Sequence, residues 1–308
     1  MKAQEWLRQV TVFTVGHSTH SLDNFVELLR AYGIERLVVV RAISNTHPRS
    51  TPMAVVANSY FKILWISICL LLTGGCFPAG KIPMDTIYFY RSKTSPNHTL
   101  LVFLPGRGDT VQSFEKNGFV DAARTAGIDS DMLGVEAHEE YYRDNTVFVR
   151  LKEDVIIPAK KQGYKDIWMV GISMGGLGAI LYDTEYPGDL RGVFALAPFL
   201  GNNTIVDEIS QAGGLARWQP HAVADGNRED SIIWSRLKNY VTPEKNAGRI
   251  YLGYGNDDRF VTTNRYFGNI LPPEQVVSVP GGHDWPTWRL LWDMLTTRAR
   301  RDAGLGGK

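Results

Sequence analysis

Cysteine, net charge and long apolar runs are all scarce in this sequence of 308 residues. The two cysteines, Cys69 and Cys76, cannot form a disulfide framework. A formal net charge of +1, with no run of lysine or arginine interleaved with aromatic residues, makes a nucleic-acid partner unexpected. The most apolar stretch, residues 63–75, is roughly half as long as the ~20 residues that a membrane-spanning helix needs.

This apolar stretch nevertheless has the plan of an export signal. Read from Met53, it has a weakly positive start at Lys62, an apolar middle and small residues before Cys76. The LLTGGC ending resembles the lipobox of bacterial lipoproteins, although Thr73 stands where leucine is commoner. The resemblance implies that residues 53–76 are a signal segment and that Cys76 becomes a lipidated N-terminus. The alternative is a buried core helix.

The signal segment predicts where the protein resides. A lipid anchor at Cys76 would place it in the bacterial cell envelope, facing the periplasm or at the outer membrane. No acidic retention signal follows the cysteine, since the next residue is Phe77. If the N-terminus is used as written, the protein is expected in the cytoplasm instead.

Before the signal segment, residues 11–41 read as a strand, a helix and a strand. The run TVGHSTHSLDNFVELLRAYGIERLVVVR, within residues 11–49, resembles the opening of the domain-of-unknown-function 488 family, with Val39 where an acid is usual. About fifty residues cannot build that domain's core. Residues 1–52 are therefore interpreted as a truncated fragment without activity, and His17 and His20 as incidental rather than as a metal site.

From about residue 85 the sequence alternates between strands and helices. Runs rich in β-branched and aromatic residues predict strands at 85–91, 99–105, 131–137, 166–172, 192–198, 249–255 and 275–280. Helices are expected over 113–127, 149–163, 176–186 and 262–271, and from residue 285 onward. This alternation predicts an α/β fold whose mostly parallel sheet is covered by helices on both faces.

One segment departs from the alternation. Residues 200–245 are polar, carry scattered tryptophans and contain no clean strand. We expect them to form a helical cap over the carboxyl edge of the sheet. Trp218 and Trp234 are expected to line a pocket or to pack within the cap, and the alternative is that they pack in the core.

A serine between glycines follows the fourth predicted strand. Residues 168–180, WMVGISMGGLGAI, contain the G-x-S-x-G form between an apolar strand and a helix-compatible run. A serine hydroxyl is a poor nucleophile until a base takes its proton, and α/β-hydrolases place their serine on such a strand-to-helix turn. The context predicts a nucleophile elbow with Ser173 at its tip; the alternative is an ordinary glycine-rich turn.

The acid and the base should follow the serine in that order. Asp258 fits the register G-x-x-D-x-x-V after the sixth predicted strand, and Asp257 is its rival. His283 follows the last predicted strand and a Gly-Gly pair, at the sheet edge where such sites assemble. Asp284 is a poor partner for it because adjacent side chains diverge. The G-H-D-W-x-x-W form resembles the histidine loop of the esterase D and mycolyltransferase-like branch of the superfamily.

The oxyanion of an acyl-transfer intermediate needs backbone N–H donors. We assign them to Met174 and to Arg107, which lies in a Gly-Arg-Gly turn. His138 begins a zinc-like H-E-x-x-H pattern, but Tyr142 occupies the second ligand position, so no metal site is expected. The Gly-Arg-Gly turn is too short for a nucleotide-binding loop, and no cofactor is implied. His138 and Glu136 are candidates to line the pocket instead.

Residues 85–298 resemble an α/β-hydrolase along nearly their whole length, within a domain assigned to 77–308. The resemblance implies a serine hydrolase in which Ser173 attacks, His283 moves the proton and Asp258 orients the imidazole. Hydrolysis of a small-molecule carboxylic ester is favoured; a thioesterase, peptidase or acyltransferase would use the same groups. The alternative from another class is a non-catalytic, surface-anchored binding lipoprotein, which the intact Ser, Asp and His in order argue against.

Overall fold

The computed structural model describes residues 80–90, 98–220, 228–241, 249–303 and 305. The fragment predicted over 1–52, the signal segment over 53–76 and Cys76 itself lie outside these residues. Among the helices in the described part of the chain, none is long and apolar enough to cross a membrane.

The described residues form one seven-stranded sheet in the order β1-β3-β2-β4-β5-β6-β7. Neighbouring strands are parallel except for β1, which pairs with β3 in the antiparallel direction. The strands are β1 (Thr86–Tyr90), β2 (Thr99–Leu104), β3 (Asp131–Val135), β4 (Asp166–Ile172), β5 (Gly192–Leu196), β6 (Ile250–Gly255) and β7 (Val276–Val279). Each lies where the sequence predicts a strand, and the predicted α/β fold with a mostly parallel sheet is confirmed.

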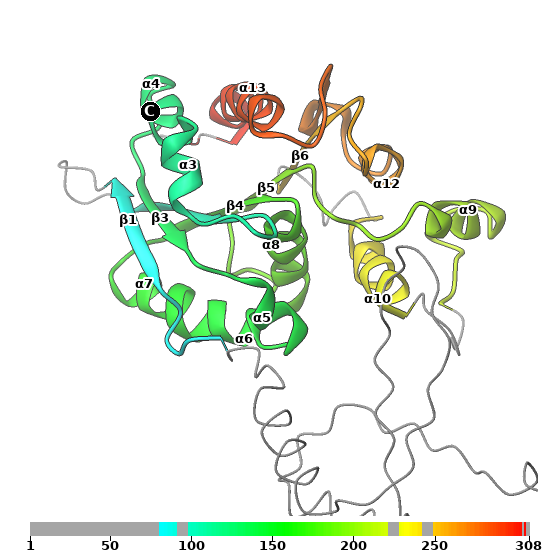
Figure 1. Ribbon diagram of the computed structural model, residues 1–308, viewed down its shortest axis with the longest axis horizontal. Coiled ribbons are helices and arrows are strands. Elements are labelled where there is room, and N and C mark those ends of the chain that lie inside the picture. Colours follow the sequence, from blue (N-terminus) through cyan, green and yellow to red (C-terminus); the bar gives the residue numbers. More distant parts are fainter. Residues whose placement is uncertain (1–79, 91–97, 221–227, 242–248, 304, 306–308) are drawn as a thin grey trace, which may run out of the picture. The chain divides into compact units, whose positions relative to one another are not determined.

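Helices cover both faces of the sheet (Figure 1). One face packs against α3 (Gln112–Lys116), α4 (Phe119–Thr125) and α13 (Trp285–Ala303). The other packs against α6 (Val147–Arg150), η1 (Leu151–Ile156), α7 (Ile157–Lys161), α8 (Met174–Glu185), α10 (Arg228–Leu237) and α12 (Val261–Gly268). Shorter or more peripheral elements are α5 (Glu139–Arg143), α9 (Thr204–Gln211), η2 (Lys238–Tyr240) and η3 (Pro273–Gln275).

Strand β2 shows why the central strands are apolar throughout. Leu100, Val102 and Leu104 pack into the core on the α8 side, whereas Leu101 and Phe103 pack into the core on the α13 side. Successive side chains of a strand point to opposite faces, so a sheet covered on both sides needs apolar residues at every position.

Two predicted helices differ in detail from the expectation. The helix expected over 113–127 is two helices, because Gly118 adopts a left-handed backbone conformation (φ 75°) between α3 and α4. The helix expected over 149–163 is present, but its middle, η1, is a π-helix. Pro158 follows directly in α7, and its missing N–H cannot continue a regular hydrogen-bond ladder.

The described part of residues 200–245 contains no strand, as predicted, and forms α9, α10 and η2 together with turns. Trp218 and Trp234 are 1% and 0% exposed, and their indole N–H groups donate to Glu208 Oε1 at 2.7 Å and to the Leu200 carbonyl at 2.8 Å. The pocket-lining alternative for these two tryptophans is therefore wrong, and core packing holds. That this segment acts as a cap stays a prediction.

The turn from β4 into α8 depends on the absence of two side chains. A Cβ on Gly171 would overlap the backbone of Gly175, and one on Gly175 would overlap the carbonyl oxygens of Leu104 and Pro105. Backbone atoms cannot swing away as a side chain can. The glycines of the G-x-S-x-G motif therefore allow β2, β4 and α8 to approach one another closely.

We predict that Gly175→Ala destabilises the fold by about 3 kcal/mol, since overpacking against backbone outweighs the ~1 kcal/mol that alanine contributes to a helix. Gly106→Ala is the matched control. A Cβ there meets Ser173 Cβ at 3.5 Å and the Ile172 carbonyl at 3.6 Å, which are ordinary contacts. Its expected cost is below about 1 kcal/mol. Urea unfolding of both variants checks this, and equal midpoints would contradict it.

Candidate active site

Ser173 stands at the sharp turn between β4 and α8 and has a left-handed backbone (φ 54°, ψ −114°). For a residue with a Cβ this conformation costs about 1–3 kcal/mol. Backbone hydrogen bonds hold it: the Ser173 N–H donates to the Leu196 carbonyl at 2.9 Å, and the Ser173 carbonyl accepts from the N–H groups of Leu177 and Phe199 at 3.0 Å each. Ser173 is buried, and this conformation places its side chain at the carboxyl edge of the sheet.

The structure brings together the three residues predicted to form a triad. Ser173 Oγ lies 3.0 Å from His283 Nε2, and His283 Nδ1 lies 2.8 Å from Asp258 Oδ2. An ionised carboxylate can only accept, so the proton of the neutral imidazole belongs on Nδ1. Nε2 is then free to accept the serine hydroxyl proton, which is the tautomer that a general base needs.

Asp258 is 2% exposed, and both of its carboxylate oxygens have partners. Oδ2 faces His283, while Oδ1 accepts the backbone N–H of Phe260 at 2.8 Å. The loops that carry the acid and the base are themselves joined, because the N–H groups of Asn256 and Asp257 donate to the carbonyls of Val279 and Gly281 at 2.8 and 2.9 Å. Backbone bonding thus fixes the distance between Asp258 and His283.

The two other acids next to the triad residues in the sequence, Asp257 and Asp284, do not take the position of Asp258. Asp257 has an exposed side chain, which agrees with the G-x-x-D-x-x-V register. Asp284 accepts the backbone N–H of Thr287 at 3.0 Å at the start of α13. That hydrogen bond lowers the pKa of Asp284 from its ordinary value. Asp284 therefore caps a helix and does not orient the imidazole.

Two aromatic rings that the sequence analysis did not single out enclose His283. The Phe260 and Trp288 rings each lie 5.0 Å from the imidazole, at interplanar angles of 89° and 88°. These two perpendicular contacts restrict rotation of the imidazole, whose side chain is 11% exposed. The signal was available, since Phe260 comes two residues after Asp258 and Trp288 ends the G-H-D-W-x-x-W motif.

The two predicted oxyanion residues lie at the loops around Ser173. Met174 is the first residue of α8, where a helix leaves its N–H groups without intrahelical acceptors. Arg107 lies in the turn after β2, and its exposed guanidinium forms an ion pair with Glu139 at 2.7 Å. The neighbouring Gly106 lies close to Ser173, since a Cβ on it would be 3.5 Å from Ser173 Cβ. The donor roles of the two N–H groups stay predictions.

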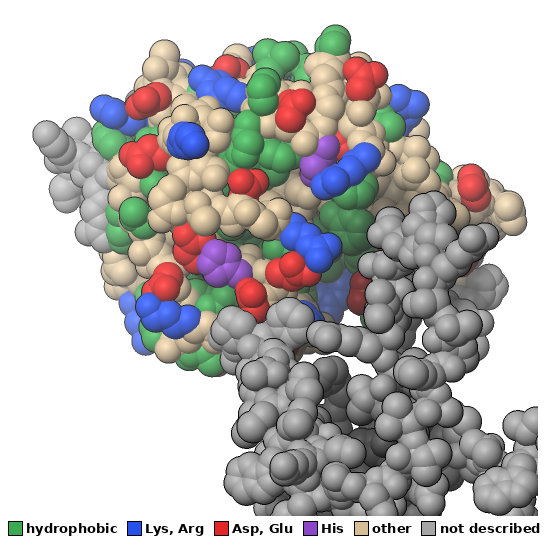
Figure 2. Space-filling view, in the orientation of Figure 1, with side chains coloured by type: hydrophobic (Ala, Val, Ile, Leu, Met, Phe, Trp, Pro, Cys, Tyr) green, Lys and Arg blue, Asp and Glu red, His purple; other side chains and the backbone are tan. Residues whose placement is uncertain are grey.

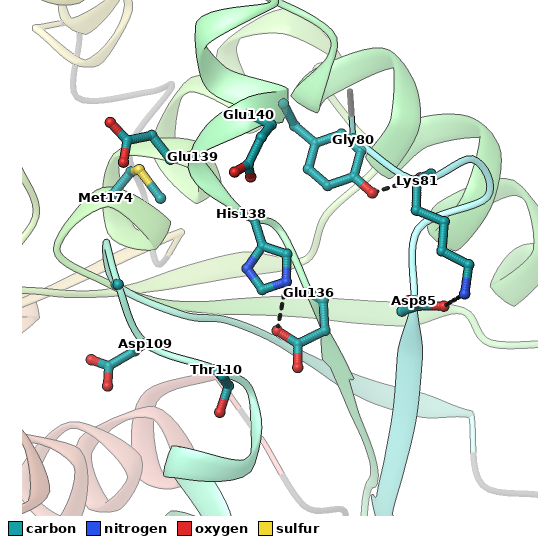
Figure 3. A pocket seen from close by; sticks show the side chains of 13 residues that line it. Gly80, Lys81, Asp85, Asp109, Thr110, Glu136, His138, Glu139, Glu140 and Met174 are labelled. Atoms are coloured by element: carbon teal, nitrogen blue, oxygen red, sulfur yellow. Dashed lines mark hydrogen bonds and ion pairs between the residues drawn. The ribbon is translucent and has the colours of Figure 1, made fainter. Parts of the chain in front are cut away.

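A cavity of about 480 Å³ opens beside this centre, between the loops that follow β2 and β3. Met174 and Gly106 form the wall nearest to Ser173, and His138 and Glu136 also line the cavity, as predicted. Acidic side chains gather around a histidine on the face seen in Figure 2. The close-up in Figure 3 shows His138 and Glu136 pointing toward one another, with Nε2 and Oε2 3.4 Å apart.

Within the described ranges, no group of three or more His, Cys, Asp and Glu side chains is arranged to hold a metal ion. Tyr142, at the second ligand position of the zinc-like pattern, is instead packed against α8, where its hydroxyl would meet a Cβ on Gly178. Burial raises its pKa far above the ordinary value. It therefore stays neutral and acts as a packing residue.

Comparison with known proteins adds a family and a relative to this geometry. Residues 154–295 match the model of an esterase family, described as "Putative esterase". An acetyl esterase of Caldicellulosiruptor saccharolyticus is 29% identical over 183 residues, which cover 53% of this chain and 65% of the relative. The match thus spans somewhat less than two thirds of that relative's length.

The fold resembles a solved structure, Est1E from Butyrivibrio proteoclasticus. The TM-score is 0.50 at 16% sequence identity, and the match covers 72% of this chain and 94% of Est1E. At this identity the likeness concerns the fold alone. With the mostly parallel sheet it shows an α/β-hydrolase fold, and together with the family match over residues 154–295 the comparisons support a carboxylesterase-like hydrolase.

Proposed function

We propose that the protein hydrolyses carboxylic esters through an acyl-enzyme on Ser173. The observation that carries the proposal is the hydrogen-bond chain from Asp258 through His283 to Ser173, with distances of 2.8 and 3.0 Å. The match to the esterase family supports the same reaction class. Because its curated relative is an acetyl esterase, acetate esters are the first substrates to test.

In the acylation step, His283 Nε2 takes the hydroxyl proton while Ser173 Oγ attacks the carbonyl carbon of the ester. The carbonyl oxygen becomes an oxyanion, which the N–H groups of Met174 and Arg107 stabilise, at typically ~3 kcal/mol for each donor. The tetrahedral intermediate collapses when the imidazolium gives its proton to the leaving alkoxide. The alcohol departs, and the acyl group remains on Ser173.

In the deacylation step, His283 removes a proton from water, and the hydroxide attacks the acyl carbon. The second intermediate expels Ser173, which recovers its proton from the imidazolium, and the carboxylic acid leaves. Asp258 stabilises the imidazolium in both steps without itself taking the proton. A thioester or an amide in place of the ester, or an acceptor alcohol in place of water, would use the same groups. Thioesterase, peptidase and acyltransferase activities are therefore the alternatives.

We predict that Ser173→Ala and His283→Ala each lower kcat for p-nitrophenyl acetate by about 10⁴-fold or more. The double variant should be little worse, because the two residues act as one unit. Asp258→Asn should cost a comparable or somewhat smaller factor, since the amide favours the wrong imidazole tautomer. Asp257→Asn is the matched control and should cost little, because its carboxylate is exposed.

Initial rates together with circular dichroism separate loss of chemistry from loss of fold. A crippled Asp257→Asn beside a nearly normal Asp258→Asn would show that the orienting acid is one residue away. Full activity in Ser173→Ala would remove the serine mechanism altogether.

The lipid anchor at Cys76 is proposed separately, since it concerns residues outside those that the structure describes. We expect mass spectrometry of the native protein from the membrane fraction to find a diacylated cysteine as the first residue. Cys76→Ser should abolish the modification, and Cys69→Ser should leave it intact. An unmodified N-terminus at Met1 in the soluble fraction would contradict the anchor.

A further inference from the structure

The cavity beside Ser173 is lined by several acidic side chains. It lies over the carboxyl ends of β2 and β3, in the loops that lead into α3 and α5. Five carboxylates line it; they belong to Asp85, Asp109, Glu136, Glu139 and Glu140. A ligand pocket owes its specificity to a small number of placed polar groups, so five acids in one wall indicate the chemistry of what enters.

The cavity adjoins the reacting atoms. A Cβ placed on Gly106 would lie 3.5 Å from Ser173 Cβ and 3.7 Å from Asp109 Oδ2. Ser173 and Asp109 therefore border the same methyl-sized position beside Gly106. Met174, whose N–H is assigned to the oxyanion, lines the same space. The cavity and its contact with Ser173, and not the carboxylates alone, identify a place for part of the substrate.

Cations of the described residues compensate only part of this charge. Lys81 pairs with Asp85 at 2.5 Å, and Arg107 at the rim pairs with Glu139 at 2.7 Å. Neither of these two cations pairs with Asp109, Glu136 or Glu140, and His138 lies beside Glu136. Even when His138 is counted as a cation, the five carboxylates outnumber the three cations.

Glu136 is partly enclosed by the protein. Its side chain is 15% exposed, and its two oxygens lie 3.4 Å from the backbone N–H of Val111. A carboxylate so shielded from water and salt acts on a bound ligand more strongly than one on the open surface.

The negative charges of this wall also act on the pKa of the neighbouring Tyr141. Its hydroxyl donates to the Lys81 carbonyl at 2.5 Å. Burial raises the pKa of Tyr141, and the negative charges of Asp85, Asp154 and Glu140 raise it further. Arg150 opposes them with a smaller effect.

We propose that this cavity binds a positively charged group of the substrate, a substituted ammonium or a guanidinium, next to the ester bond that Ser173 attacks. The inference rests on the proposed function and narrows its substrate class to cationic esters. Asp109, Glu136 and Glu140 are the specificity-determining residues. An anionic substrate of the same shape is disfavoured by the same field.

The test compares acetylcholine with its uncharged isostere, 3,3-dimethylbutyl acetate. Calorimetric binding to the Ser173→Ala variant measures recognition without turnover. We expect the cationic ester to bind about tenfold tighter or more at low ionic strength, and the ratio of the two Kd values to shrink in high salt. With the Ser173-intact protein, the ratio of kcat/KM values should show the same preference.

Glu136→Gln and Asp109→Asn, in the same Ser173→Ala background, should each lower the Kd ratio by several-fold. Glu115→Gln is the matched control, because this exposed acid of α3 lies outside the cavity, and it should leave the ratio unchanged. Equal Kd values for the two esters would overturn the cation site. Tight binding of the cationic ester without hydrolysis of either ester would retain the site and overturn the proposed function.

Discussion

The left-handed backbone at Ser173 is the constraint on which the rest of the site depends. The conformation turns β4 into α8 within one residue. It is tolerated because the Leu196 carbonyl at the end of β5 accepts the serine N–H, and the N–H of Phe199, just after β5, donates to the serine carbonyl. Gly171 and Gly175 permit the close packing behind it. The strain is therefore supported by the central strands, which are the most deeply buried elements of the fold, and the hydroxyl is positioned without help from a flexible loop.

Around this fixed point the site has two sides built from opposite halves of the sheet. The loops after β6 and β7 carry Asp258 and His283, and the backbone bonds between these loops set the proton-transfer geometry. The loops after β2 and β3 carry the cavity and its acids. The proposed acid and base thus lie on other loops than the acids of the cavity, so that these acids can change without disturbing the imidazole, which Phe260 and Trp288 contact.

Strand positions and the order of Ser173, Asp258 and His283 could be predicted from the sequence because they depend on local patterns: apolar runs, glycine spacing and residues that follow strand ends. Other features depend on contacts distant in the chain. Gly118 splits a helix that reads as continuous, and Trp218 and Trp234 join the core where their polar surroundings left a pocket open. The sequence makes Glu136 a candidate pocket residue, but the full set of acids that lines the cavity could not be predicted. Strands β2 and β3 become neighbours only in the folded sheet, and this places Asp109 and Glu136 on one cavity.

The central claim, that Ser173 is a nucleophile activated by His283, is tested most directly by locating a covalent adduct. The full-length protein is treated briefly with a fluorophosphonate, digested and sequenced by tandem mass spectrometry, alongside His283→Ala. We predict that Ser173 is the one phosphonylated residue and that labelling of His283→Ala is slower by orders of magnitude. A folded protein that gains no adduct, or gains it on another residue at the same rate in both proteins, would contradict it.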